Sequence, residues 1–406
     1  MWKTVFPGIA MIGVTYALAR YSFGLFLPNI SSELSLSESQ AGSVGSAAYI
    51  AYTLALLTSS ILIYKYGARR MVLFSGAAAF FGILGMAFSQ GYYVLAFSAF
   101  FAGLGSGWIS PAFSQVVAQS LEPDLRDKGN TWINTGTSFG IVFTGLAALL
   151  FSEHWRWSYI LFAVLAFMVF WWNALVIKES EENASQPNLN IFKIGTLKKA
   201  RFLIAASIGV GFSSSIYWTF ARSYISEIHG VSVNESVVFW MIMGAAGILG
   251  GIAGAIIQTI GLHLSYRLGV IAVALSISIL TIHQYAAIYL SAVLFGVAFI
   301  FMTGLFIVWG TRQFSETPSI GVSISFFSLG IGQSAGSAAA GVLIESISYP
   351  FAFLLFSAIG CCFVFCKTAI VSSKKRSLST TSKDFLAVLL AYSSYTAFLV
   401  TYSKIQ

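Results

Sequence analysis

Apolar residues follow one another in long runs along this chain, without the strict alternation that marks a half-buried β-strand. A helix needs about 20 apolar residues to cross the hydrocarbon core of a bilayer, and more when it is tilted. By this measure the sequence predicts twelve spanning helices, at residues 4–28, 38–64, 71–89, 92–120, 129–151, 156–177, 202–225, 235–261, 264–283, 285–312, 319–345 and 350–371. The expected class is therefore an all-α membrane protein.

The connections between the predicted spans are short, with one exception. Residues 178–201, KESEENASQPNLNIFKIGTLKKAR, are polar and charged, and they predict a linker between a six-helix bundle at 1–177 and a second at 202–371. Residues 372–406 form a basic tail in which 385–402 are apolar again. Those 18 residues lie at the short limit for a spanning helix, so a thirteenth span and a helix in the membrane interface are both open.

The charges support a membrane location and give an orientation. Only 9% of the residues are charged, against about 25% in a soluble domain, and the mean hydropathy is +0.82. With a cytoplasmic N-terminus, 18 of the 22 Lys and Arg residues fall in cytoplasmic segments, including 65–70 and 178–201. The positive-inside rule therefore predicts that topology in a bacterial inner membrane. The net charge of +8 is then an anchor at the inner face and does not indicate nucleic-acid binding.

The two halves repeat at an offset of 194 residues. This offset places Glu33 on Glu227, Gly67 on Gly261 and Gly136 on Gly330. One offset that serves three separated places indicates a duplicated six-helix unit. Such duplication is typical of secondary transporters, whose substrate site lies between the halves near the bilayer midplane.

Arg20 is a charge inside the first apolar run, which otherwise extends from Val5 to Pro28. An arginine at such a depth costs about 2.5–3.5 kcal/mol on insertion scales. All fourteen acidic residues fall outside the spans or at their edges, so the sequence offers it no buried carboxylate. We favour binding of an anionic substrate group; hydrogen bonds to neighbouring helices and snorkelling to an interface are the alternatives. Arg222, near the outer end of its span, has the length to snorkel.

Residues suited to catalysis or metal binding are scattered. The four histidines, His154, His229, His263 and His283, fall near span ends without ligand-spaced partners. The three cysteines lie in the last span, where a small apolar role is favoured over a thiolate metal site. Gly103, Gly105 and Gly107 have no preceding strand and fit helix packing better than a phosphate loop. We expect no enzyme, no metal, no cofactor and no ATP hydrolysis.

Four segments resemble the major facilitator superfamily of transporters. SILIYKYGARRM (60–71) is similar to the family's loop signature, with Gly67, Arg69 and Arg70 matching while Tyr64 replaces the usual Asp. That replacement removes the carboxylate that, by the resemblance, caps a helix and pairs with an arginine, so the resemblance does not imply a conformational latch here. FFAGLGSGWISP resembles the glycine-rich fourth helix, with Ala99 where many members have Arg, and WRWSYILF resembles the entry to the sixth helix. ARYSFGLFLP is similar to the first helix of the YbfB/YjiJ branch.

The resemblance implies a fold, a cavity and a mechanism. It implies two pseudo-symmetric six-helix bundles around a cavity lined by helices one, four, seven and ten, with help from two, five, eight and eleven. Besides Arg20 and Arg222, the candidate cavity residues on these helices are Tyr16, Tyr49, Tyr52, Gln115, Asn134, Tyr217, Trp218, Thr303 and Gln333. We expect a monomeric transporter that moves a small organic anion by alternating access. An exporter of hydrophobic drugs and a non-transporting receptor are the alternatives.

The coupling ion is open at this level, because the predicted spans hold no carboxylate or histidine deep inside. A coupling proton would travel with the substrate or use an edge group such as Glu33. Facilitated diffusion and anion exchange are equally compatible with the sequence.

Overall fold

The computed structural model describes residues 1–151, 154–179, 194–314 and 318–368, and every regular element in these ranges is a helix. Eleven of the described helices are long and apolar enough to cross a membrane, and Tyr349–Phe365 adds a shorter apolar helix. The expected all-α membrane fold is therefore confirmed. The apolar tail segment 385–402 and most of the 178–201 linker lie outside the described residues.

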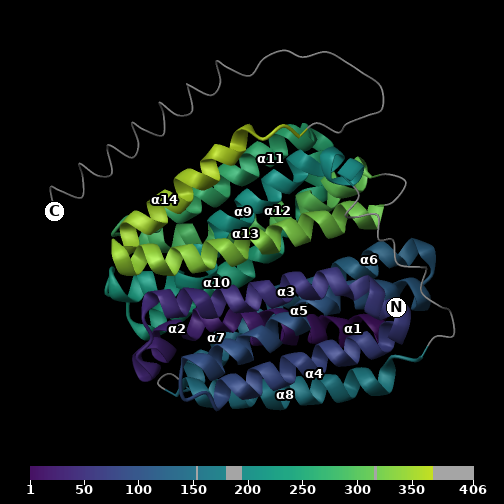
Figure 1. Ribbon diagram of the computed structural model, residues 1–406, viewed down its shortest axis with the longest axis horizontal. Helices are drawn as coiled ribbons and strands as arrows, with labels where there is room; N and C mark the ends of the chain where they lie inside the picture. The colour runs from purple at the N-terminus through teal and green to yellow at the C-terminus, as the bar shows by residue number, and fades with distance from the viewer. Residues whose placement is uncertain (152–153, 180–193, 315–317, 369–406) are drawn as a thin grey trace. The chain divides into compact units, whose positions relative to one another are not determined.

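The helices form two groups that follow the chain order (Figure 1). The first group consists of α1 (Trp2–Ile12), η1 (Gly13–Tyr21), α2 (Ser22–Leu34), α3 (Glu38–Tyr66), α4 (Ala68–Ala87), α5 (Tyr92–Ser120), α6 (Pro123–Asn134), α7 (Gly136–Phe151) and α8 (Trp155–Val176). The second group consists of α9 (Ile194–Glu227), α10 (Val233–Gly247), η3 (Ile248–Ile252), α11 (Ala253–Ile279), α12 (Tyr285–Gln313), α13 (Pro318–Ser346), α14 (Tyr349–Cys362) and η4 (Phe363–Phe365).

The first membrane helix is continuous from Trp2 to Leu34, but its middle part, η1, is a π-helix. A π-helix bonds each carbonyl to the amide five residues later, and such segments are rare and concentrate at functional sites. The segment Gly13–Tyr21 contains Arg20. The sequence predicted the helix but not this change of its winding.

The two loops that the repeat predicts to be equivalent have the same backbone conformation. Gly67, between α3 and α4, has φ +84° and ψ 156°, and Gly261, a kink inside α11, has φ +81° and ψ 161°. Positive φ favours glycine because it has no Cβ to clash with the backbone. The non-helical backbone at Gly261 divides α11 into two helical parts, close to the predicted boundary between residues 261 and 264.

The seventh membrane helix begins earlier than the sequence predicted. The predicted span starts at residue 202, whereas α9 starts at Ile194 and includes part of the predicted linker. Lys198, Lys199 and Arg201 are good helix formers, so the helix continues past the apolar stretch into a polar turn. Hydropathy detects where a helix enters lipid, not where its backbone begins.

The two groups of helices pack closely toward one end. We call it the Glu33 end, and the opposite end, at the α3–α4 turn, the Arg70 end. There α3 packs along α13: the Ser46 hydroxyl donates to the Ser334 carbonyl at 2.9 Å, and the Ser337 hydroxyl donates to the Gly42 carbonyl at 3.0 Å. The amide of Ser39 also donates to the Glu345 carboxylate at 2.8 Å. These contacts close the two groups against each other in the half of the molecule toward the Glu33 end.

Candidate functional site

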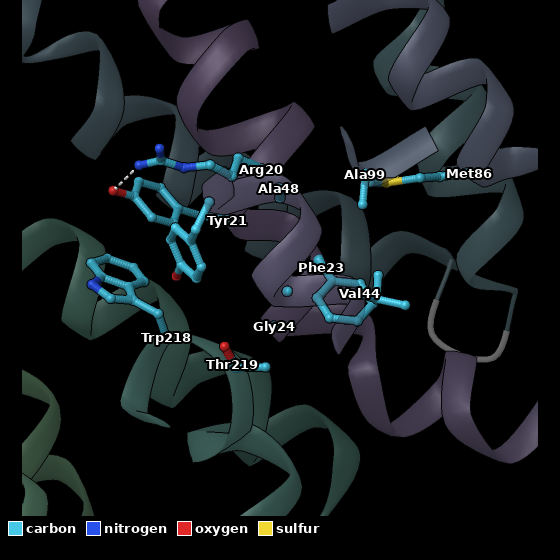
Figure 2. Close-up of a pocket in the computed structure, with 12 residues that line it drawn as sticks. Arg20, Tyr21, Phe23, Gly24, Val44, Ala48, Met86, Ala99, Trp218 and Thr219 are labelled. Carbon is cyan, nitrogen blue, oxygen red and sulfur yellow. Dashed lines mark hydrogen bonds between the residues drawn. The ribbon is translucent and has the colours of Figure 1, made fainter. Parts of the chain in front are cut away.

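Arg20 lies at a cavity between the two groups of helices, formed by η1, α2, α3 and α9 with one residue each from α4 and α5 (Figure 2). Its side chain is 6% exposed. The cavity is lined by Arg20, Tyr21, Phe23, Gly24, Val44, Gly45, Ala48, Tyr49, Met86, Ala99, Trp218 and Thr219. Of the predicted site residues, Arg20, Tyr49 and Trp218 line this cavity, and Tyr16 and Tyr52 contact the Arg20 guanidinium.

Four tyrosine rings surround the Arg20 guanidinium. Its central carbon lies 4.3 Å from the ring centre of Tyr52, 4.5 Å from Tyr21, 4.9 Å from Tyr16 and 5.5 Å from Tyr49. A cation over an aromatic face is attracted by the ring quadrupole, worth about 2 kcal/mol when the pair is desolvated. The cage therefore stabilises a buried positive charge without supplying a negative one.

Not all N–H donors of the Arg20 guanidinium have hydrogen-bond partners. One terminal nitrogen donates to the Tyr21 hydroxyl at 2.5 Å, and the other reaches the Ser106 hydroxyl only at 3.4 Å, the outer limit for a hydrogen bond. The Nε atom is buried and has no hydrogen-bond partner among the described residues. No carboxylate of the described part forms an ion pair with Arg20. A buried donor without a partner is costly, so this group is suited to receiving an acceptor from outside.

The cavity is nearly closed in this state. Its volume is about 10 Å³, which is roughly the space that one water molecule needs. The Trp218 ring stacks on Tyr21 with their centres 4.2 Å apart, and the indole Nε1 is buried without a hydrogen-bond partner in the described chain. An organic ligand would therefore require the α9 side of the cavity to move away from η1.

Tyr21 is a site residue that the sequence analysis missed. The predicted residue Tyr16 does lie beside Arg20, with its ring centre 4.9 Å from the guanidinium carbon. In a π-helix Tyr16 is also close to the residue five positions later, and the Tyr16 and Tyr21 ring centres lie 6.3 Å apart. Tyr21 hydrogen-bonds Arg20 and contacts Trp218, so it connects the charge to the opposite group of helices.

Arg222 does not snorkel, and that expectation is wrong. It is 2% exposed and donates to the carbonyl of Leu25, to Asn29 Oδ1 at 3.0 Å and to the Ser236 hydroxyl at 3.0 Å. The reason is that α9 packs against α2, so carbonyl and amide oxygens of α2 accept hydrogen bonds from the guanidinium. The sequence showed only that Arg222 lies near the end of its helix. Arg222 joins the two groups of helices and does not line the cavity.

Five other predicted residues lie away from Arg20. Tyr217 is in the core of the second group, where its hydroxyl bonds Ser291 at 2.7 Å and its ring stacks on Phe295. Thr303 bonds the Ile300 carbonyl on its own helix. Gln333 is buried, with Nε2 lacking a partner in the described chain, while Gln115 is half-buried and Asn134 is exposed. None of the five lines the cavity.

The loop motif holds two helices together at the Arg70 end. Arg69 donates through Nε to the Ile177 carbonyl at 2.7 Å and through a terminal nitrogen to the Ala174 carbonyl at 2.8 Å. These carbonyls are at the C-terminus of α8, where a cation also meets the negative end of the helix dipole. Arg70 forms an exposed 2.8 Å ion pair with Glu179, and Tyr64 is exposed. Arg69 thus binds backbone carbonyls at the C-terminus of α8, although Tyr64 stands at the position of the usual aspartate.

Glu33 is already paired. Its carboxylate accepts from Arg156 Nε at 2.9 Å and from Trp155 Nε1 at 2.6 Å. Both donors stabilise the ionised carboxylate, which speaks against Glu33 as a proton carrier.

Two of the histidines are partners, contrary to expectation. His229 and His283 face each other with their Nδ1 atoms 2.7 Å apart, and His229 Nε2 contacts the Leu280 carbonyl at 2.8 Å. Burial lowers the pKa of His229 below its ordinary value, and the hydrogen bond to the Leu280 carbonyl opposes that shift. They are 54 residues apart in the sequence, so only the fold brings them together.

Two relatives from Bacillus subtilis (strain 168) resemble this chain in sequence. A hexuronate transporter is 25% identical over 64% of this chain and 65% of its own length. The uncharacterized transporter YybO is 23% identical over 57% of this chain and 60% of its own length. The matches thus span less than two thirds of either relative.

Solved structures show the same fold. The nucleoside transporter NupG superposes with a TM-score of 0.74 at 13% identity, covering 92% of this chain and 99% of its own. A D-xylose-proton symporter superposes with a TM-score of 0.73 at 12% identity, covering 89% of this chain and 95% of its own. At such low identity the likeness concerns the fold alone.

The family model of the Major Facilitator Superfamily matches residues 9–327, which is most of the chain. That match agrees with the two groups of membrane helices and with the equivalent turns at Gly67 and Gly261. The chain belongs to the Major Facilitator Superfamily, and it is a membrane transporter.

Proposed function

We propose that this transporter carries a small organic anion, with Arg20 holding the anionic group at the cavity between the two bundles. The observation that carries the proposal is the buried guanidinium in a tyrosine cage, with an unpartnered Nε and no carboxylate partner among the described residues. A carboxylate accepts two parallel hydrogen bonds from a guanidinium, which fixes its orientation as well as its charge. The anion would offset the burial cost of Arg20.

The composition of the cavity wall favours an organic anion over a bare inorganic one. Tyr21, Phe23 and Trp218 give aromatic surface beside the charge, and Thr219 adds a hydroxyl. Arg20 is the one cation among the lining residues that the structure describes. The similarity to a hexuronate transporter supports testing sugar acids, since each combines a carboxylate with a hydroxylated ring.

We further propose alternating access, with boundaries at about residues 177 and 202 for the two bundles. In this view the Arg70 end is cytoplasmic and the N-terminus lies on the same side, in a bacterial inner membrane. The concentration of Lys and Arg at that end supports the orientation. The tight packing of α3 on α13 toward the Glu33 end corresponds to a state that is closed to the outside.

The test is uptake into liposomes that contain the purified protein. A panel of radiolabelled carboxylates, including hexuronates, is compared with their uncharged alcohol or amide analogues and with a cationic drug. We expect saturable uptake of at least one carboxylate and none of its neutral analogue. Uptake of hydrophobic cations instead would support a drug exporter, and binding without uptake would support a receptor. Imposed pH gradients and internal anions then distinguish proton coupling, exchange and facilitated diffusion.

A further inference from the structure

The histidine pair at the Glu33 end is held by two tight turns of the second bundle. His229 follows the C-terminus of α9, where the Val231 amide donates to the Ile225 carbonyl at 3.1 Å and Gly230 has φ +64°. His283 precedes α12, and the Gln284 amide donates to the Ile282 carbonyl at 2.8 Å. Both backbones are therefore fixed before any ligand arrives.

The contacts of His229 determine which of its nitrogens carries the proton. The carbonyl of Leu280 can only accept, so the Nε2 that lies 2.8 Å from it must be the N–H donor. In the neutral ring Nδ1 then has a free lone pair, and this lone pair points at Nδ1 of His283. A second nitrogen that donates to a backbone carbonyl is the arrangement that orients histidines bound to metals.

We propose that His229 and His283 form a two-histidine site for one divalent transition-metal ion of the Cu²⁺, Ni²⁺ and Zn²⁺ class. Imidazole nitrogen suits these ions, and water would complete the coordination sphere because His283 is exposed. On binding, the proton of His283 Nδ1 moves to its Nε2 through solvent, so both Nδ1 atoms face the metal and no net proton is released.

The geometry requires little movement. With metal–nitrogen bonds of about 2.0–2.1 Å, two nitrogens at a square-planar right angle are about 2.9 Å apart, and at a tetrahedral angle about 3.3 Å. The present separation is 2.7 Å, so the square-planar arrangement of Cu²⁺ or Ni²⁺ needs a smaller shift than tetrahedral Zn²⁺. An exposed side chain such as His283 can supply either shift by rotation.

Ring contacts also hold His229 in place beside His283. His229 packs edge-on against Tyr224 with ring centres 5.0 Å apart, and the two histidine rings lie 4.8 Å apart. A bound ion would join the α9–α10 connection to the α11–α12 connection. It would therefore stabilise one bundle without bridging the two, and the proposal is independent of the transported substrate.

The test is a titration of untagged, chelator-treated protein in detergent with NiCl₂ by calorimetry. We expect one saturable ion in the unaltered protein and an affinity about tenfold weaker or worse in His229→Ala and in His283→Ala, since even the loss of an orienting partner costs 10- to 100-fold. His263→Ala is the matched control: this histidine is in α11, contacts Thr368 and should leave binding unchanged.

Spectroscopy with Cu²⁺ gives a second readout, which does not depend on affinity. Electron paramagnetic resonance should show two nitrogen ligands in the unaltered protein and one at most in His283→Ala, an exposed position where folding should be unaffected. Equal binding by all three alanine variants, or no saturable binding by the unaltered protein, would overturn the proposal. So would a lower melting temperature of the variants without any metal binding, which would make the pair a hydrogen bond only.

Discussion

Replacing Arg20 by Gln tests whether the buried charge serves the substrate or the fold. In the structure, Nε is unpartnered and one terminal nitrogen makes only a 3.4 Å contact, so the guanidinium has donor capacity left for an anionic group. Losing a buried charge pair of that kind costs about 2–5 kcal/mol, or roughly 30-fold to several thousand-fold in affinity. Arg20→Lys keeps the charge but not the paired donors, so binding should weaken without vanishing.

The fold should tolerate the same change. Arg20→Gln loses a charged hydrogen bond to Tyr21, worth about 1.5–3 kcal/mol, and ring contacts worth about 2 kcal/mol. It also removes a membrane charge that costs about 2.5–3.5 kcal/mol, so the two effects nearly cancel. We therefore expect a nearly unchanged melting temperature together with lost uptake.

The assay combines liposome uptake per folded molecule with thermal unfolding of the purified protein. The reverse pattern, a clearly lower melting temperature and expression with uptake per folded molecule little changed, would refute the reasoning. Arg20 would then be a packing residue that holds the tyrosine rings together.

Three further predictions concern closure, the Arg70 end and topology. Gly24→Ala should open the Glu33 end, because a Cβ at this position would overlap the Trp218 carbonyl. Labelling of a cysteine introduced into the cavity should then increase. Gly91→Ala, with open space around the added Cβ, is the control and should leave the labelling unchanged. Arg69→Ala should lose two hydrogen bonds to carbonyls and about 1–3 kcal/mol of stability in thermal unfolding. Arg70→Ala should lose less than about 1 kcal/mol, because it removes only an exposed ion pair. Equal losses in the two variants would contradict the role assigned to Arg69. A cysteine at Lys65 should react with impermeant reagents only from the cytoplasmic side, and labelling from outside intact cells would overturn the proposed orientation.

The amino-acid sequence by itself determined the membrane class and the repeat. Apolar runs this long and numerous fit a membrane and not a water-exposed surface. In lipid, backbone N–H and C=O groups without hydrogen bonds are costly, so each run folds into a helix that pairs them internally. Gly67 and Gly261 were predicted to be equivalent, and both adopt the same positive-φ turn. These features are local, so they are readable from composition and spacing. The start of α9 at Ile194 was not readable, because polar residues also propagate a helix.

For the site, the sequence identified Arg20 as a charge without a buried acid, because an ionised group in an apolar run is conspicuous in any fold. It did not identify Tyr21 or the correct role of Arg222. Tyr21 joins the site because the first helix is wound as a π-helix there, a backbone change that residue periodicity does not show. Arg222 finds oxygens of Leu25 and Asn29 only because α9 packs on α2.

The tertiary structure alone decided which polar residues meet. Tyr217 and Gln333 lie on helices expected to line the cavity, yet a helix turns about 100° per residue, so neighbours on one helix face different partners. The same holds for His229 and His283, whose turns are far apart in the chain and adjacent in space. A sequence fixes which groups a membrane helix must bury, whereas packing between helices decides which of those groups face one another.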